Sequence, residues 1–324
     1  KIMNYQATTH LVSDTMLLAL RRFHWAASVI VMAIGAFVLF AWLQQPAWSH
    51  ILIAGPYTMK PNTAVAFILA GLALGLQQEP VSPIKRRSAQ LAALITLLLS
   101  AVTLAQYLFG WNLGIDEVLL SRQADATLRA SSTIFVAAFP LRMAVNTACC
   151  FLLLSSAILW FDGQTRGGRP AEWLTMCAGF ITLTALIAYI YGINELLDPF
   201  AFMRMALSTA LAFGVLCWGI LAARPQCGMM AYFWSSGPQG LVARRMAFGG
   251  TLSLLLLSFL TRWGQRLELY AHYVESSLLL SLGMVIFALL VYQSMRALAR
   301  LEEQRQASAA AFQEQYALLQ GIIN

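Results

Sequence analysis

Long runs of apolar residues, separated by short polar segments, recur along the whole chain. A transmembrane helix needs about 20 predominantly apolar residues, and these runs are of that order. Apolar and polar residues do not alternate within the runs, which argues against the strands of a membrane barrel. The pattern predicts about eight transmembrane helices, over residues 23–43, 63–76, 89–109, 143–160, 173–191, 205–222, 246–260 and 276–292.

Composition supports this interpretation. The 324 residues are 59% hydrophobic and 11% charged, and the mean hydropathy is +0.68. Soluble domains have about a quarter of their residues charged, so a single soluble globule could not bury this much apolar surface. We therefore expect an all-α polytopic membrane bundle whose solvent and first partner is the lipid bilayer.

The distribution of basic residues predicts the orientation in the membrane. With the N-terminus in the cytoplasm, 14 of the 21 Lys and Arg residues fall on the cytoplasmic side and 7 on the other side. The positive-inside rule favours this arrangement, with both termini in the cytoplasm of a bacterial inner membrane. Topology and anionic lipids explain the net charge of +7 without nucleic-acid binding. We expect a cytoplasmic segment at 1–22, a transmembrane domain at 23–293 and a signalling helix at 294–324.

A nine-residue pattern occurs three times. The pattern M-x-x-[NS]-T-A-x-x-F is found at 59–67, 143–151 and 205–213, each time at the start of an even-numbered span. Two of the copies follow similar segments, 106–110 and 188–192, that end the preceding span. The chain is therefore predicted to contain helical hairpins repeated three times, followed by a divergent fourth hairpin.

The recurring polar residues of this pattern have two interpretations. Asn62, Asn146 and Ser208 are suited to cap helix N-termini, and the Thr-Ala pairs that follow allow close helix packing. Alternatively, the three helix N-termini converge and form a polar pocket below the outer surface. The candidate ligand-binding residues are Asn62, Thr63, Arg142, Asn146, Thr147, Arg204, Ser208 and Thr209.

Basic residues stand at the start of all three patterned helices. Arg142 and Arg204 occupy the same place in the second and third copies, and Lys60 lies close to it in the first. A cation at a helix N-terminus opposes the helix dipole, so each needs a compensating group. That group is either an anionic ligand or lipid headgroup, or a carboxylate from the preceding loop: Asp116, Glu117, Glu195 or Asp198.

The sequence contains no recognisable catalytic constellation, and we do not expect this part of the protein to be an enzyme. The centres of the spans carry almost no charge, which does not favour an ion pump. A transporter of a neutral or lipid-like solute remains an alternative. His50 and His272 are the one histidine pair expected at a similar depth, so haem or metal binding by this pair is a second alternative.

The residues after the last span are rich in helix-forming side chains and lack Gly and Pro until residue 321. A broken heptad seam of Leu298, Leu301, Phe312 and Leu319 predicts a helix that leaves the membrane and pairs weakly in a homodimer. We expect the native polypeptide to continue from this helix into an output domain.

Residues 311–324 resemble the helix that leads into a PAS domain in bacterial sensor histidine kinases and diguanylate cyclases. The segment from Leu108 to Asp116, Leu-Phe-Gly-Trp-Asn-Leu-Gly-Ile-Asp, and the segment 143–148 resemble the multi-span N-terminal membrane regions of the same proteins. The resemblance implies a membrane-embedded sensory domain that binds a small or lipophilic ligand and relays a shift to a cytoplasmic kinase or cyclase. It supplies no ligand motif, so no functional residues are taken from it.

Overall fold

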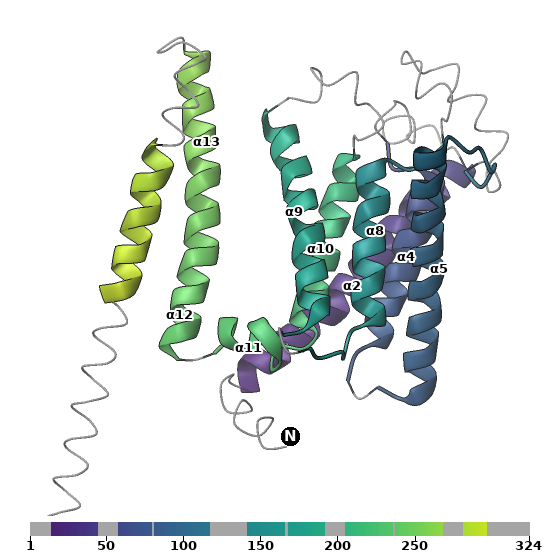
Figure 1. Cartoon of the computed structure of the whole chain (residues 1–324), viewed down its shortest axis with the longest axis horizontal. Coiled ribbons are helices and arrows are strands. Elements are labelled where there is room, and N and C mark those ends of the chain that lie inside the picture. The colour runs from purple at the N-terminus through teal and green to yellow at the C-terminus, as the bar shows by residue number, and fades with distance from the viewer. Residues whose placement is uncertain are drawn as a thin grey trace, which may run out of the picture. The chain divides into compact units, whose positions relative to one another are not determined.

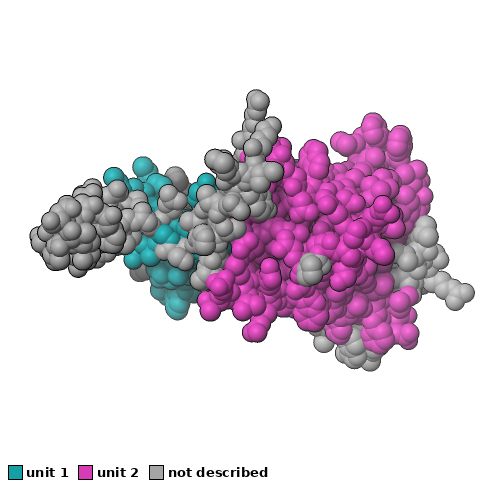
Figure 2. Space-filling model, turned by 90° about the horizontal axis from the view of Figure 1, so that it is seen from below, with its two compact units in different colours: residues 1–13, 231–324 teal, residues 14–230 magenta. Residues whose placement is uncertain are grey.

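The computed structural model describes residues 14–44, 58–79, 81–116, 141–165, 168–191, 205–235, 237–267 and 281–296. These residues are predominantly helical and include no strand; one isolated β-bridge joins Thr165 and Gly168. The all-α prediction is thus confirmed for the part of the chain that the structure describes. The chain divides into two compact units (Figure 2). Residues 14–230, magenta and labelled unit 2 in the figure, are called the first unit in the text, and the unit with the described residues from 231 onward, teal and labelled unit 1, is called the second.

Long and short apolar helices alternate along the chain. Four stretches are long and apolar enough to cross a membrane: Asp14–Gln44, Pro83–Phe109, Pro170–Tyr189 and Gly240–Thr261. Four shorter apolar helices of 10–17 residues lie between or after them: Pro61–Leu76, Val145–Leu159, Leu207–Ala222 and Ser281–Arg296. The chain is therefore a helical membrane protein. Each of the eight predicted spans overlaps one of these helices, but only four of those described have full spanning length.

The first unit contains six main helices, in which proline and glycine residues mark several of the boundaries. The long ones are α2 (Asp14–Gln44), α5 (Pro83–Phe109) and α9 (Pro170–Tyr191), and the short ones are α4 (Pro61–Leu76), α8 (Val145–Leu159) and α10 (Leu207–Ala222). The Ser82 hydroxyl accepts a hydrogen bond from the Lys85 amide at the start of α5, and Gly110, with a φ of 66°, ends that helix. Helix α2 begins well before residue 23, where the predicted span starts.

These six helices form a closed ring of neighbours (Figure 1). Each short helix packs against the long helix before it, giving the pairs α2–α4, α5–α8 and α9–α10. Each short helix also packs against a second long helix, giving the pairs α4–α5, α8–α9 and α10–α2. The three short helices contact one another as well, so they occupy the centre of the unit.

Each long helix faces the central helices with a stripe of buried or half-buried side chains, and the three stripes are similar. Buried or half-buried positions recur at alternating spacings of four and three residues, as in a coiled-coil seam. Small and hydroxyl side chains are common in these stripes, which lets neighbouring helices approach closely. The stripes are His24, Ser28, Val31, Gly35, Val38 and Trp42 in α2; Ala89, Ala93, Thr96, Ser100, Thr103 and Tyr107 in α5; and Ala171, Thr175, Ala178, Thr182, Ala185 and Tyr189 in α9.

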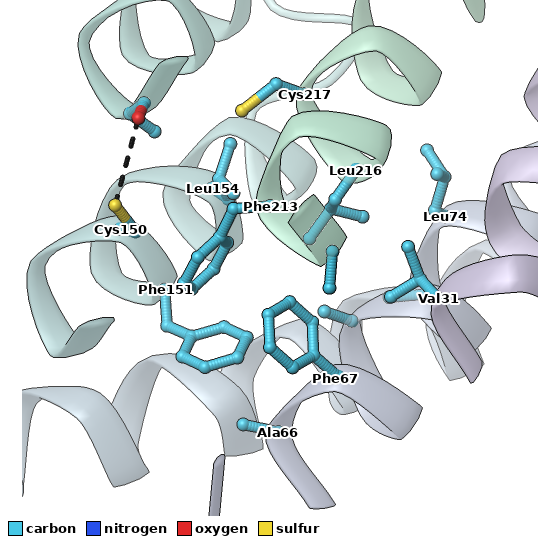
Figure 3. Packing of buried hydrophobic residues seen from close by; sticks show 14 of the residues in the cluster. Val31, Ala66, Phe67, Leu74, Cys150, Phe151, Leu154, Phe213, Leu216 and Cys217 are labelled. Atoms are coloured by element: carbon cyan, nitrogen blue, oxygen red, sulfur yellow. Dashed lines mark hydrogen bonds between the residues drawn. The ribbon is translucent and has the colours of Figure 1, made fainter. Parts of the chain in front are cut away.

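The centre of the core is a cluster of three phenylalanines (Figure 3). Phe67, Phe151 and Phe213 each end one copy of the nine-residue pattern, and each is completely buried. Their ring centroids are 4.8 Å apart for Phe67 and Phe151, and 4.7 Å apart for each of the other two pairs. These separations lie within the favourable range for aromatic pairs. The three copies of the pattern therefore meet at one point.

Glycines permit the closest helix contacts. A Cβ atom at Gly71 would lie 2.7 Å from Met32 Cγ, and one at Gly219 would lie 2.9 Å from Ala27 Cβ. The Ser28 hydroxyl, which faces α4, donates to the Gly71 carbonyl at 2.7 Å. Helix α2 is thus held against both α4 and α10 by contacts that larger side chains would prevent.

The short helix α11 (Gly228–Phe233) follows α10. The second unit then contains α12 (Pro238–Arg244), the π-helical turn η4 (Arg245–Gly249), α13 (Gly250–Arg266) and the helix Ser281–Arg296. The predicted seventh span, 246–260, corresponds to η4 and much of α13. Many large apolar side chains of this unit are exposed, including Leu252, Phe259, Met284 and Phe287, as expected for helices that face lipid.

Candidate functional site

A hydrogen bond connects the start of each short helix of the first unit to the end of the preceding long helix. An aromatic side chain of the long helix donates a hydrogen bond to the backbone carbonyl of the methionine that opens the pattern, and all three methionines are buried. The three bonds are Trp42 Nε1 to Met59 O (2.9 Å), Tyr107 Oη to Met143 O (3.0 Å) and Tyr189 Oη to Met205 O (2.7 Å). We call this part of the unit the methionine end.

The patterned polar residues do not occupy the predicted N-cap positions, although Asn62 Oδ1 accepts a hydrogen bond from the Thr63 amide in the first turn of α4. The N-cap residues of α4, α8 and α10 are Lys60, Ala144 and Ala206, and none of them makes a side-chain capping bond. Asn62, Asn146 and Ser208 lie two positions later, inside the first helical turn. Each helix instead begins at the second residue after its methionine, directly after an N-cap residue with extended backbone geometry.

A buried polar cluster lies at the methionine end. The Arg142 guanidinium pairs with the Asp116 carboxylate, with Nε and Oδ2 2.8 Å apart. The Asn62 amide donates to the other carboxylate oxygen, Oδ1, at 3.0 Å. All three side chains are buried. Asp116 thus joins the start of α4 to the segment before α8, and it is one of the loop carboxylates that the sequence suggested as a partner for Arg142.

Arg142 has further contacts. Its Nη2 donates to the Trp111 carbonyl at 3.4 Å, and its guanidinium carbon lies 5.5 Å from the centre of the Tyr107 ring. Gln106 can orient its amide so that its oxygen accepts from Arg142 Nη2 at 3.2 Å. A buried ion pair is stable only when additional hydrogen bonds satisfy its groups, and this one is well satisfied.

Lys60 differs from Arg142 because its charge is not compensated. Its side chain is 7% exposed, and its amine has no hydrogen-bond partner among the described residues. Burial lowers the pKa of the Lys60 amine to about 8. A buried, unpaired ammonium group is costly, and it stands at the N-terminus of α4, where the helix dipole also disfavours a cation.

The other predicted ligand-binding residues are only partly brought together. Thr63, Thr147 and Thr209 are all buried, at equivalent positions in α4, α8 and α10. Asn146 and Ser208 are half-buried. Arg204, His50 and His272 lie outside the described residues, as do the signalling-helix positions Leu298, Leu301, Phe312 and Leu319. No group of three potential metal ligands occurs in the parts of the chain that the structure describes.

Sequence reasoning missed a second buried cluster, at the ends of the short helices. Arg224 contacts Asp162 at 3.3 Å and donates to the Gln77 carbonyl at 3.0 Å. Arg169 donates to the Phe161 carbonyl at 2.6 Å. From the sequence, both arginines appear only as loop charges that set topology. No local feature distinguishes them, since Arg22 and Arg245 border predicted spans more closely.

Comparisons with protein-family models, with curated proteins and with solved structures find no match.

Proposed function

We propose that residues 14–222 form three related helical hairpins packed about a pseudo-threefold axis, followed by a divergent fourth hairpin, with eight membrane crossings and both termini in the cytoplasm. Three equivalent sets of contacts support the repeat: the phenylalanine cluster, the three aromatic-to-carbonyl bonds and the closed ring of helix neighbours. The short central helices can still lie within the bilayer, because the long helices packed around them shield them from lipid.

We further propose that the bundle is the membrane-embedded sensory part of a bacterial signalling protein. A small or lipophilic ligand binds at the methionine end, and its binding shifts the last helix, which relays the change to a cytoplasmic kinase or cyclase domain. The observation that carries this proposal is the buried polar cluster of Asn62, Asp116 and Arg142 at the methionine end, together with the buried and unpaired Lys60 two residues before Asn62. Ionisable residues inside membrane proteins are expensive and usually serve a function.

The arrangement favours binding over catalysis or pumping. The buried charged groups that the structure describes gather at the two ends of the bundle, while aromatic, aliphatic and hydroxyl side chains fill its centre. A continuous path of ionisable residues through the bundle, which a proton or ion pump would need, is not present in the described helices. Ligand binding can act as a signal only if the ligand prefers one of two conformations, so the proposal requires a measurable change in the last helix.

The test begins with the protein purified in mild detergent. Mass spectrometry identifies co-purifying small molecules, and an absorption spectrum detects haem. We expect a colourless protein that carries a specific molecule, which is lost from Arg142→Ala and Asn146→Ala. Arg86→Ala is the matched control, because Arg86 lies on an exposed part of α5. Retention of the molecule by both site variants would exclude the methionine end as the binding site.

A further inference from the structure

Lys60 is the least compensated charge in the described part of the bundle. Its side chain is more than nine-tenths buried, its amine nitrogen is inaccessible, and no described carboxylate pairs with it. Lys60 lies two residues before Asn62, and the carboxylate that Asn62 contacts, Asp116, is already occupied, because its other oxygen pairs with Arg142. The start of α4 therefore holds a buried cation with which no described carboxylate pairs.

The position of this charge suits an anion. Lys60 is the N-cap residue of α4, a helix of 16 residues, and helix N-termini attract negative groups through their free amides and dipole. The Lys60 side chain makes no capping bond, and Asn62 Oδ1 accepts from the Thr63 amide in the first turn. An anionic group placed here would compensate the Lys60 ammonium, with which no described side chain pairs, and would also interact favourably with the helix dipole.

An exposed apolar surface adjoins the same cluster. Leu108, Phe109, Trp111 and Leu113 all have more than half of their side-chain surface exposed, and the rings of Phe109 and Trp111 stack with centroids 4.8 Å apart. The Trp111 carbonyl accepts a hydrogen bond from Arg142, which places this surface directly beside the polar cluster. A molecule that combines an anionic group with a hydrocarbon chain would match both features.

We infer that the methionine end binds the anionic headgroup of an amphiphile, a carboxylate or a phosphate, with Lys60 as its counter-ion. This inference rests on the proposed sensory function and specifies the chemistry of its ligand. A free fatty acid and an acidic phospholipid share this chemistry, and the experiment distinguishes them.

The experiment uses the full chain in phosphatidylcholine nanodiscs, with three probes added separately: oleate, phosphatidylglycerol and inorganic phosphate. The readouts are the melting temperature and the probe retained in native mass spectrometry. We expect oleate or phosphatidylglycerol, but not inorganic phosphate, to raise the melting temperature. A response to oleate alone assigns a fatty acid, and a response to phosphatidylglycerol alone assigns a lipid headgroup.

Three variants test the role of Lys60. Lys60→Met should weaken binding by roughly tenfold to a hundredfold, because a charge-assisted hydrogen bond is lost. Lys60→Arg should keep most of the affinity. Lys85→Met is the control, since Lys85 is exposed at the start of α5. Wild-type affinity in Lys60→Met, or an equal response to inorganic phosphate, would overturn the inference.

Two further measurements keep the test decisive. If Lys60→Met does not fold, wild-type binding must weaken as pH rises above about 8, where the free Lys60 amine loses its charge. Binding that is independent of pH would overturn the inference.

The outcomes also separate this inference from the proposed function. If the Lys60 variants bind normally while Asn146→Ala loses a different co-purified molecule, the amphiphile inference fails and the sensory proposal stands. If the amphiphile binds through Lys60 but the last helix does not respond, the sensory proposal alone fails.

Discussion

At the scale of single residues, the phenylalanine cluster should contribute strongly to stability. Phe151 contacts both other rings and is completely buried. Phe151→Ala should lower the free energy of unfolding by about 3–5 kcal/mol, because it removes apolar contacts and leaves a cavity. Phe180, which is 69% exposed on α9, provides the control. Equal losses of thermal stability in Phe151→Ala and Phe180→Ala would contradict a central role for the cluster.

A second prediction at this scale concerns the loss of stability when the ion pair between Asp116 and Arg142 is broken. Asp116→Asn leaves the buried guanidinium without a counter-charge and should cost about 3–5 kcal/mol of stability. The double variant Asp116→Leu, Arg142→Met should recover part of that loss, because neither charge remains buried. Arg86→Ala, which breaks an exposed ion pair with Asp162, should cost less than about 1 kcal/mol. A double variant less stable than Asp116→Asn in thermal unfolding would argue against this account.

The buried Lys60 amine should make the free energy of unfolding depend on pH in protein freed of anionic amphiphiles. The pKa of its amine is lowered to about 8 in the folded protein, against about 10.4 for an unperturbed lysine. Between these values the unfolded state binds more protons, so the free energy of unfolding rises with pH, by about 3 kcal/mol in all. The stability of wild type relative to Lys60→Met should therefore increase from pH 8 to pH 10. A constant difference in melting temperature would show that the Lys60 ammonium carries no burial penalty.

At the scale of helices, close packing depends on which face of α10 a glycine occupies. A Cβ atom at Gly219 would meet Leu74 and Ala27 within 3.0 Å, whereas one at Gly214 would have no neighbour within 4 Å. Alanine also favours a helix over glycine by about 1 kcal/mol. Gly214→Ala should therefore be neutral or stabilising, and Gly219→Ala should be destabilising. Melting temperatures measured in the same detergent test this, and the opposite order would contradict the packing of α10 against α2.

The sequence predicted the helical elements better than their boundaries and contacts. Apolar runs located the four long and four shorter apolar helices that the structure describes, because a lipid environment demands such runs, but they did not indicate α11 or α12. The pattern at 59–67, 143–151 and 205–213 indicated a repeat, but it could not show that Phe67, Phe151 and Phe213 meet in one cluster. Asn62 was assigned as a cap, yet it bonds to Asp116, which is distant in the sequence. Such contacts depend on tertiary packing, which local residue preferences do not encode.

At the scale of the whole molecule, the proposed sensory function requires that ligand binding in the first unit alter the last helix. The described helix Ser281–Arg296 lies in the second unit and carries many exposed apolar side chains. For a ligand to signal, its binding must alter this helix through a difference in affinity between two conformations. The response should therefore disappear in a variant that no longer binds, even though the helix itself is unchanged.

Hydrogen exchange of residues 281–324, measured with and without the organic extract recovered from purified wild-type protein, tests this claim most directly. The account predicts that the extract changes exchange in these residues in delipidated wild type and has no effect in Asn146→Ala. If the extracted molecule binds but exchange in the last helix is unchanged, the bundle is not a sensor that signals through this helix.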